Sequence, residues 1–182
     1  DLGRYLVGEF KEVCGLMHTF IKKRPLEDKD AKAGGLSGSG TKKMGTVTVD
    51  DAAMFIGRFQ NGALASLEAT RFALCRKNHI TFEINGSKGS LFVDREDMNR
   101  LQFFDNTNPA DRQGFRDIIV TQPGGIHPYV GHWWPPGHII GYEHSFVHSV
   151  ADFVNAIVDH KPISPNFEDG LKNQTILEAV EE

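Results

Sequence analysis

Two histidines one helical turn apart carry the clearest chemical signal in the chain. His144 and His148 are four residues apart, so on a helix both imidazoles lie on one face and can meet a single metal ion. Helical zinc hydrolases place a Glu between such a pair, whereas here Glu143 precedes both. The other interpretation is a polar helix face exposed to water. We expect this second arrangement, and we therefore predict no metal site.

Aromatic and imidazole side chains also crowd into the irregular segment 124–141, which precedes this helix. The segment contains Trp133-Trp134-Pro135-Pro136-Gly137, together with Tyr129 and three histidines, His127, His132 and His138. Loops are normally polar because their backbone stays hydrated. Such a composition indicates either packing against a sheet or a ligand pocket with apolar walls. An indole suits the C–H face of a sugar ring, and imidazoles suit its hydroxyl groups.

Arg71 is a charged residue inside a stretch of small and apolar residues, 69–73. An arginine on an edge strand can extend its head group to water. Alternatively, its guanidinium points at a substrate oxygen or at a partner domain. Both interpretations stay open at this stage.

The elements that must position these residues are mostly strands, followed by helices. Alternating or β-branched runs predict strands over 13–21, 52–59, 63–73, 79–84, 90–94, 101–104 and 118–121. Asn61-Gly62 is a strong hairpin signal between two of them. An apolar stripe of Phe146, Val150, Phe153, Val154 and Ile157 predicts a helix over 142–160. A helix end over 1–7 and a final helix from Pro165-Asn166 complete an α+β fold, an open, mostly antiparallel β-sheet with helices on one face.

Residues 26–46 lose the apolar pattern and become rich in Asp, Lys, Gly and Ser, which predicts a mobile surface loop. Its Gly-rich stretch over 34–40 lacks the preceding strand and following helix that a phosphate-binding loop needs. We therefore expect no phosphate site there.

Composition narrows the class of protein. The chain has 182 residues, a formal net charge of −4, 40% hydrophobic residues and 24% charged residues, which are ordinary globular values. The mild acidic excess argues against nucleic-acid or membrane partners. Cys14 and Cys75 form no metal or redox spacing, so we expect buried thiols in a cytoplasmic protein. Because the chain begins at Asp1 without an initiator Met, we expect a fragment.

An ordered set of segments over nearly the whole chain resembles a known family. The segments are Asp1-Leu2-Gly3-Arg4-Tyr5-Leu6, Val49-Asp50-Asp51-Ala52-Ala53, Phe59-Gln60-Asn61-Gly62-Ala63, Glu68-Ala69-Thr70-Arg71, Phe82-Glu83-Ile84-Asn85-Gly86-Ser87-Lys88-Gly89-Ser90 and Asp169-Gly170. They are similar to the C-terminal domain of the glucose–fructose oxidoreductase/inositol dehydrogenase/MocA (Gfo/Idh/MocA) oxidoreductases. The resemblance implies that residues 1–182 form a substrate-binding and oligomerisation domain.

The resemblance further implies a two-domain enzyme that transfers a hydride between NAD or NADP and a sugar, inositol or related polyol. The cofactor is bound mainly by an N-terminal Rossmann domain, which this chain lacks. Asp1-Leu2 match the end of the family's catalytic helix, so its catalytic His lies three residues upstream and its catalytic Lys in the other domain. No catalytic residue is then expected in this chain, which we predict to be inactive alone.

The stretch 133–144 resembles the substrate loop of a subgroup of the family. On this basis we predict substrate contacts from Trp133, His138, Tyr142 and His144, with Arg71 as a weaker addition. The alternative function is a non-catalytic oligomerisation or regulatory module of the same fold.

The first hairpin strand is apolar on both faces. One face carries Ala53, Phe55 and Phe59, and the other carries Ala52, Met54 and Ile56. One face can take the helices, so the other needs a second sheet. We therefore expect a homodimer or homotetramer formed through the sheet.

Overall fold

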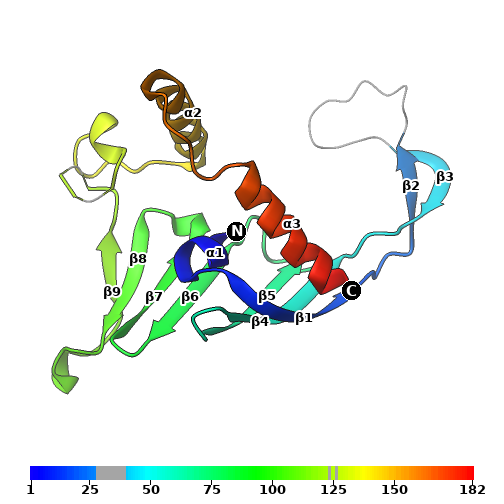
Figure 1. Cartoon of the computed structure of the whole chain (residues 1–182), viewed down its shortest axis with the longest axis horizontal. Helices are drawn as coiled ribbons and strands as arrows, with labels where there is room; N and C mark the ends of the chain where they lie inside the picture. The colour runs from blue at the N-terminus through cyan, green and yellow to red at the C-terminus, as the bar shows by residue number, and fades with distance from the viewer. Residues whose placement is uncertain (28–39, 123, 126) are drawn as a thin grey trace. The chain divides into compact units, whose positions relative to one another are not determined.

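The computed structural model describes residues 1–27, 40–122, 124–125 and 127–182 (Figure 1). These residues form two compact units. Unit 1 comprises Asp1–Leu74 with Ser164–Glu182, and unit 2 comprises Cys75–Ile163. That the two together form the single domain expected over 1–182 stays a prediction.

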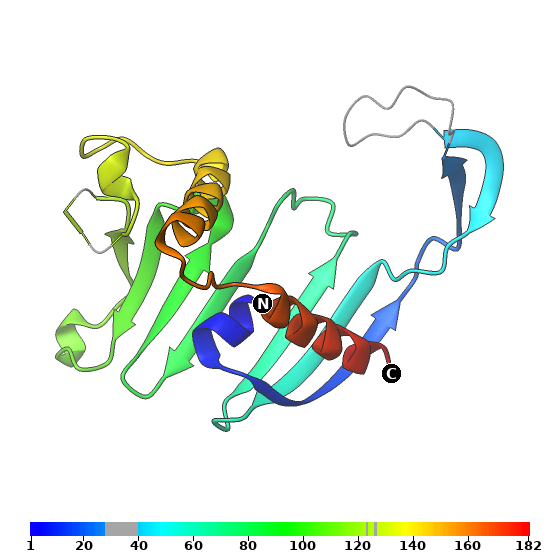
Figure 2. The same ribbon diagram turned by 45° about the horizontal axis from the view of Figure 1, so that its top comes forward.

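Unit 1 is built on a three-stranded antiparallel sheet and a helix that lies over it (Figure 2). Its elements are α1 (Leu2–Val7), β1 (Phe10–His18), β2 (Lys23–Glu27), β3 (Gly40–Thr46), β4 (Ala52–Phe59), β5 (Leu64–Thr70) and α3 (Phe167–Glu181). The sheet order is β1-β4-β5, and β2 pairs with β3 separately. The predicted hairpin at Asn61-Gly62 is confirmed, because it joins β4 to β5 and Gly62 takes a φ of 91°.

Strand register divides the sheet of unit 1 into two faces. Gly15 pairs with Phe55 in β4, and a Cβ on Gly15 would lie 2.6 Å from Cγ1 of Val180 in α3, so this is the face that α3 covers. The opposite face carries Cys14, Leu16, Met54, Ile56 and Leu64, all of them exposed. The absence of a side chain at Gly15 thus lets α3 approach the sheet closely.

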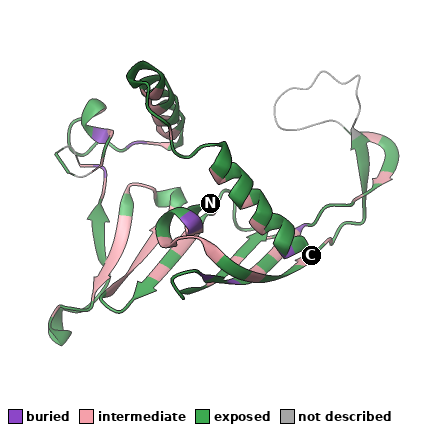
Figure 3. Ribbon diagram, viewed as in Figure 1, coloured by how far each residue is buried: buried purple, intermediate pink, exposed green. Residues whose placement is uncertain are grey.

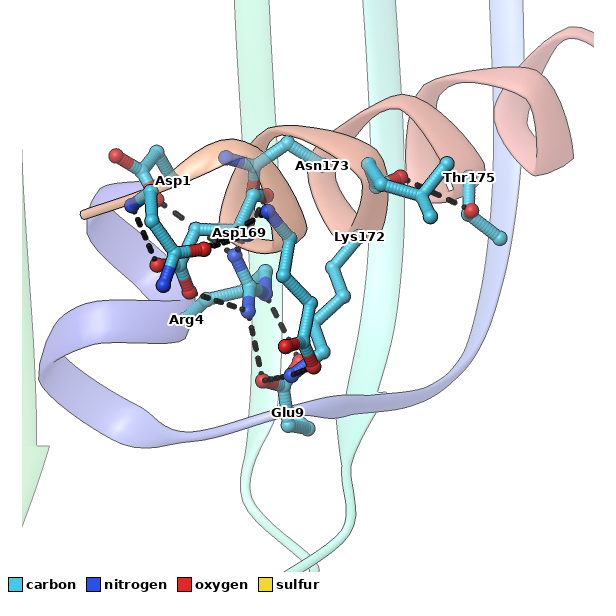
Figure 4. A network of polar contacts seen from close by, with 10 residues as sticks. Asp1, Arg4, Glu9, Asp169, Lys172, Asn173 and Thr175 are labelled. Carbon is cyan, nitrogen blue, oxygen red and sulfur yellow. Dashed lines mark hydrogen bonds and ion pairs between the residues drawn. The ribbon is translucent and has the colours of Figure 1, made fainter. Parts of the chain in front are cut away.

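Arg4 ties the two ends of the chain together (Figure 4). Its guanidinium donates two hydrogen bonds to the Glu9 carboxylate, at 2.7 and 2.8 Å, and one to the Asp169 carbonyl of α3 at 3.1 Å. It also donates to Oδ1 of Asn173 at 3.2 Å. The hydrogen bonds from Arg4 lower the pKa of Glu9. The bonds from the buried Arg4 side chain to Asp169 and Asn173 fix α1 against the first two turns of α3.

Asp51 has a similar anchoring role at the other end of β1. Its buried carboxylate accepts hydrogen bonds from the backbone N–H groups of Phe20 and Ile21 and from Arg24, all between 2.8 and 2.9 Å. These donors, the Ile21 N–H first, lower the pKa of Asp51. The turn between β1 and β2 is thereby held at the start of β4.

Unit 2 is a four-stranded antiparallel meander followed by an irregular segment and a helix. Its elements are β6 (Thr81–Gly86), β7 (Gly89–Asp94), η1 (Arg95–Asp97), β8 (Arg100–Asp105), η2 (Ala110–Arg112), β9 (Arg116–Ile119), η3 (Val130–His132) and α2 (Tyr142–Asp159). The strand order β6-β7-β8-β9 follows the chain. Together with unit 1, these strands and helices confirm the predicted α+β fold with mostly antiparallel pairing.

Two predictions from composition are wrong. The ends of the expected loop over 26–46 belong to strands, because Lys23–Glu27 and Gly40–Thr46 pair through their backbones despite their polar side chains. Residues 28–39, which hold most of the Gly-rich stretch, lie outside the described residues. Cys14 and Cys75 are exposed rather than buried. Cys14 lies on the uncovered face of the sheet, and Cys75 lies in a turn after β5.

Few side chains are fully buried in the described part of the chain (Figure 3). The buried apolar residues are Phe59, Val130, Ile140 and Val180. Large apolar side chains on the sheet of unit 1 and on α2 are exposed instead. Among the described residues, no helix combines the length and the apolarity that a membrane span requires.

The close approach of α3 to β1 predicts that Gly15→Ala destabilises unit 1. The new methyl group would overlap Val180, whose branched side chain and neighbouring backbone cannot move without shifting α3. We expect a loss of about 1–3 kcal/mol in the free energy of unfolding, measured by urea denaturation. Gly170→Ala in α3 is the control, because a Cβ there meets nothing within 4 Å and Ala favours the helix. Equal stabilities of the two variants would contradict the packing described.

Candidate functional site

The first turn of α2 holds His144 in a defined orientation. The backbone N–H of Gly141, which precedes the helix, donates to Nδ1 of His144 at 3.0 Å. An imidazole nitrogen that accepts a hydrogen bond is unprotonated, so in the neutral ring the proton sits on Nε2. The side chain is 12% exposed. His144 therefore presents a hydrogen-bond donor from a largely buried ring.

Two buried residues anchor the irregular segment that faces α2. Val130 and Ile140 are buried. The side chain of Asn99, just before β8, binds both backbone polar groups of Ile140. Its Nδ2 donates to the Ile140 carbonyl at 2.9 Å, and its Oδ1 accepts from the Ile140 N–H at 3.1 Å. The hydroxyl of buried Thr121 also donates to Oδ1 of Asn99, at 2.8 Å. This arrangement satisfies backbone groups that a loop would otherwise expose to water.

Aromatic side chains of this segment pack against the histidines on one face of α2. Nε1 of Trp133 donates to Nε2 of His148 at 2.7 Å, and the Trp133 ring meets His144 edge-on at a centroid distance of 4.4 Å. Tyr129 stacks on His148 with ring centroids 4.1 Å apart, and its hydroxyl donates to Asp152 at 2.5 Å. We call Tyr129, Trp133, His144, His148 and Asp152 the ring cluster.

The electrostatics of the ring cluster favour the neutral form of His148. Burial lowers the pKa of His148, and the neighbouring His127 and His144 lower it further, whereas Asp152 acts in the opposite direction. Because Nε2 of His148 accepts from Trp133, the neutral ring carries its proton on Nδ1. His127 accepts at Nδ1 from the backbone N–H groups of Tyr129 and Val130, at 3.3 and 3.2 Å.

The expected orientation of α2 is wrong. We predicted that its histidine face would be exposed to water, but His144, His148 and Asp152 are partly buried against the irregular segment. The apolar residues are exposed instead, between 49% and 70%: Phe146, Val147, Val150, Phe153, Val154, Ile157 and Val158. Hydrogen bonds to Tyr129 and Trp133 satisfy the polar face, which offsets its desolvation. The exposed apolar residues of α2 are referred to below as the α2 stripe.

A cavity of about 630 Å³ lies beside the start of α2. Its walls include Ile139, Ile140 and Tyr142 on one side, and charged residues of η1 on the other. The guanidinium of Arg95 lies 5.1 Å from the centroid of the Tyr142 ring. The cavity therefore combines an apolar wall with charged and aromatic hydrogen-bonding groups, as small-molecule sites do.

The structure brings together some of the residues predicted to contact substrate. Trp133 and His144 belong to the ring cluster, and Tyr142 lines the adjacent cavity. His138 is exposed, with Nδ1 3.2 Å from the Pro135 carbonyl and its ring 6.4 Å from that of Trp134. Arg71 belongs to unit 1, where it is exposed directly after β5.

The sequence-based site omitted Tyr129, His148, Asp152 and Asn99. For His148 and Asp152 a signal existed, since they follow His144 at intervals of four and share its helix face. Nothing in the sequence around Asn99 indicates that its side chain holds Ile140, 41 residues further along the chain.

The family model described as "GFO/IDH/MocA C-terminal domain" matches residues 1–92, half of the chain. The chain belongs to the GFO/IDH/MocA family. Levoglucosan dehydrogenase from Pseudarthrobacter phenanthrenivorans is 42% identical over 183 residues, covering 100% of this chain and 46% of the relative.

Solved members of the GFO/IDH/MocA family share the fold. An oxidoreductase domain protein from Kribbella flavida is 49% identical with a TM-score of 0.86, over 100% of this chain and 44% of its own. Levoglucosan dehydrogenase solved with NADH and L-sorbose is 40% identical with a TM-score of 0.86, over 99% of this chain and 44% of its own. The chain thus spans less than half the length of these relatives.

The environment of His148 predicts how stability depends on pH. Its pKa is lower in the folded chain than the ordinary value of 6.5, so the unfolded chain binds more protons as the pH falls. The free energy of unfolding should therefore decrease from about pH 7.5 to 5.5, and His148→Gln should flatten this dependence. Urea denaturation across this range measures it, with His132→Gln, an exposed histidine of the same unit, as control. A slope that is unchanged in His148→Gln would contradict the assignment.

Proposed function

We propose that this chain is the substrate-side domain of an NAD(P)-dependent oxidoreductase that acts on a sugar, inositol or related polyol by hydride transfer in the cytoplasm. The observation that carries this proposal is the ring cluster beside the cavity, in a family whose named relative is a sugar dehydrogenase. A solved levoglucosan dehydrogenase in complex with NADH and levoglucosan is 39% identical to this chain.

The chemistry of the candidate site suits an uncharged polyhydroxylated substrate. His144 offers a donor at Nε2, and Tyr142 and Arg95 lie at the cavity wall. Neutral imidazoles can hydrogen-bond to hydroxyl groups without requiring a charged partner. Trp133 donates its N–H to His148 and thereby orients the ring cluster, whereas the neighbouring Trp134 is 47% exposed and can stack on a sugar face.

The described residues do not offer a pyrophosphate site for the dinucleotide. Helix N-termini bind phosphates through free backbone N–H groups. At α3 these groups donate to the side chain of Asn166, and Asp169 adds a carboxylate there. At α2 the carboxylate of Glu143 lies close to Gly141. The cofactor, which accepts the hydride when bound, is therefore proposed to be held mainly by an N-terminal Rossmann domain that also supplies the catalytic Lys, with the catalytic His just upstream of Asp1.

The α2 stripe supports this two-domain organisation. Seven large apolar side chains on one face of a single helix exceed what a water-exposed helix normally shows. The relatives are more than twice as long as this chain, so they contain residues able to cover such a face. We propose that the protein's own Rossmann domain covers the α2 stripe.

The uncovered sheet face of unit 1 supports a second partner, another copy of the chain. Leu16, Met54, Ile56 and Leu64 are between 50% and 72% exposed on this face, and antiparallel sheets can pack face to face. A homodimer or homotetramer through the sheet follows. The alternative function, a non-catalytic oligomerisation or regulatory module, rests on the same face.

The proposed function predicts the effect of His144→Ala in the full-length protein. Loss of the Nε2 donor should lower kcat/KM for NAD(P)-dependent oxidation at least tenfold, about 1.4 kcal/mol. Steady-state kinetics with NAD and NADP against sugars, inositols and anhydrosugars measure it. The control is His132→Ala, an exposed histidine of the same unit that lies outside the ring cluster. Unchanged kinetics in His144→Ala would remove His144 from the substrate site.

The same assay separates the two functions. Reduction of cofactor with any of these substrates supports the dehydrogenase. If every substrate is inactive while NAD(P)H still binds, the substrate class is wrong. If the cofactor does not bind, the non-catalytic module is the better description.

The sheet interface predicts that Ile56→Glu lowers the oligomeric state. A carboxylate at this position would be buried without a partner between two apolar sheets, and such burial is strongly unfavourable. Light scattering after size exclusion at micromolar concentration measures the mass. Leu74→Glu is the control, because Leu74 is also apolar and exposed, at 88% against 63% for Ile56, but lies in the turn after β5. An unchanged mass for Ile56→Glu, or a wild-type monomer, would contradict the interface.

A further inference from the structure

His79, Asp94 and Glu96 form a compact group of potential metal ligands in unit 2. One nitrogen of His79 and one oxygen from each carboxylate all lie within 4.8 Å of one another. His79 lies in the loop just before β6, Asp94 ends β7, and Glu96 belongs to η1. The N–H of Arg95 donates to the Ile80 carbonyl at 2.9 Å, which fixes the two segments side by side. Among the described residues this is the one such group of three.

The nitrogen of His79 that faces this group lacks an ordinary partner. Nδ1 is buried and has no hydrogen bond, and the nearest acidic oxygen, Oε2 of Glu96, is 4.0 Å away. That distance is too long for a hydrogen bond. Because buried polar atoms are nearly always satisfied, an unpartnered imidazole nitrogen indicates a missing interaction.

Backbone N–H groups hold the two carboxylates in place beside His79. The N–H of Asn78 donates to Oε1 of Glu96 at 3.0 Å, and the N–H of Glu96 donates to Oδ1 of Asp94 at 2.9 Å. Each carboxylate is thus held through one oxygen, and the other oxygen of Glu96, Oε2, is the one that lies 4.0 Å from Nδ1 of His79. Outer hydrogen bonds that fix ligand orientation in this way are a regular property of metal sites.

We propose that His79, Asp94 and Glu96 bind a first-row divalent transition-metal ion, with Nδ1 of His79 and one oxygen from each carboxylate as ligands. At bond lengths of about 2.0–2.2 Å, ligand atoms around one zinc ion lie roughly 3 to 4 Å apart. The three atoms therefore need to approach one another by only about 1 Å. Glu96 is partly exposed, so its side chain can make this adjustment and water can complete the coordination. The imidazole ligand favours zinc or a similar ion over calcium or magnesium.

The site would join the loop before β6 to η1, and η1 forms one wall of the cavity described above. The proposal does not depend on the dehydrogenase assignment, since metal binding is measured without turnover and only Glu96 of the three ligands also lines the cavity. It also differs from the metal site considered for His144 and His148, whose inward-facing nitrogens are engaged with Gly141 and Trp133.

Zinc titration of the purified full-length protein tests the proposal. We expect saturable binding of Zn²⁺ by calorimetry, and a Kd at least tenfold weaker in His79→Ala and in Glu96→Gln. The second variant keeps an oxygen that can accept the Asn78 N–H, so it removes ligand charge with little effect on the fold. Co²⁺ provides a second readout, because ligation by the imidazole changes its visible spectrum.

Matched controls are Glu83→Gln, an exposed carboxylate on β6, and His132→Ala, an exposed histidine of the same unit. Both should bind zinc as the wild type does. Absence of saturable binding would overturn the proposal, and so would equal binding in the wild type, His79→Ala and Glu96→Gln. Binding that is lost in His132→Ala or in His144→Ala, but kept in the two ligand variants, would place the metal elsewhere and also overturn it.

Discussion

The candidate site depends on the orientation of α2, which turns its polar face inward. An amphipathic helix normally buries its apolar side, because apolar burial is the main favourable contribution to folding. In α2 the buried side carries His144, His148 and Asp152, and its polar atoms are satisfied by Tyr129, Trp133 and Gly141. Burial of polar groups costs free energy unless each is hydrogen-bonded, so these contacts are a condition for the orientation. The ring cluster thus depends on the inward orientation of the polar face of α2.

Because α2 packs its polar face within unit 2, its apolar face stays exposed and can bind a partner domain. The α2 stripe and the uncovered sheet face of unit 1 are two separate apolar surfaces, one in each unit. Each has a proposed occupant: the Rossmann domain for the first and a second copy of the chain for the second. Unit 1 itself is held by contacts between distant parts of the sequence, above all the Arg4 network between α1 and α3. Its sheet can therefore present a fixed surface to a partner.

Local patterns in the sequence predicted most of the fold. Alternation placed β4 to β8, Asn61-Gly62 placed the hairpin, and the 3.6-residue period placed α2. The start expected at Pro165-Asn166 placed α3. Polar strands were missed, since β2 and β3 are paired by backbone hydrogen bonds that leave no apolar pattern. For the candidate site, His144 and Trp133 were predicted because they lie in the segment 133–144, which resembles the substrate loop of a subgroup of the family. Asn99 and the inward orientation of α2 could not, because both depend on contacts across tens of residues.

Hydrogen exchange tests most directly whether the segment 127–140 and α2 form the substrate wall. Exchange reports local opening of backbone hydrogen bonds, so a bound sugar should slow exchange where it contacts the protein. The measurement compares the full-length protein saturated with NADH, with and without levoglucosan, by mass spectrometry. The account predicts that peptides within 127–152 become more protected when the sugar is added. If the sugar is turned over with NAD but leaves these peptides unchanged and protects others, the substrate wall lies elsewhere and the account is wrong.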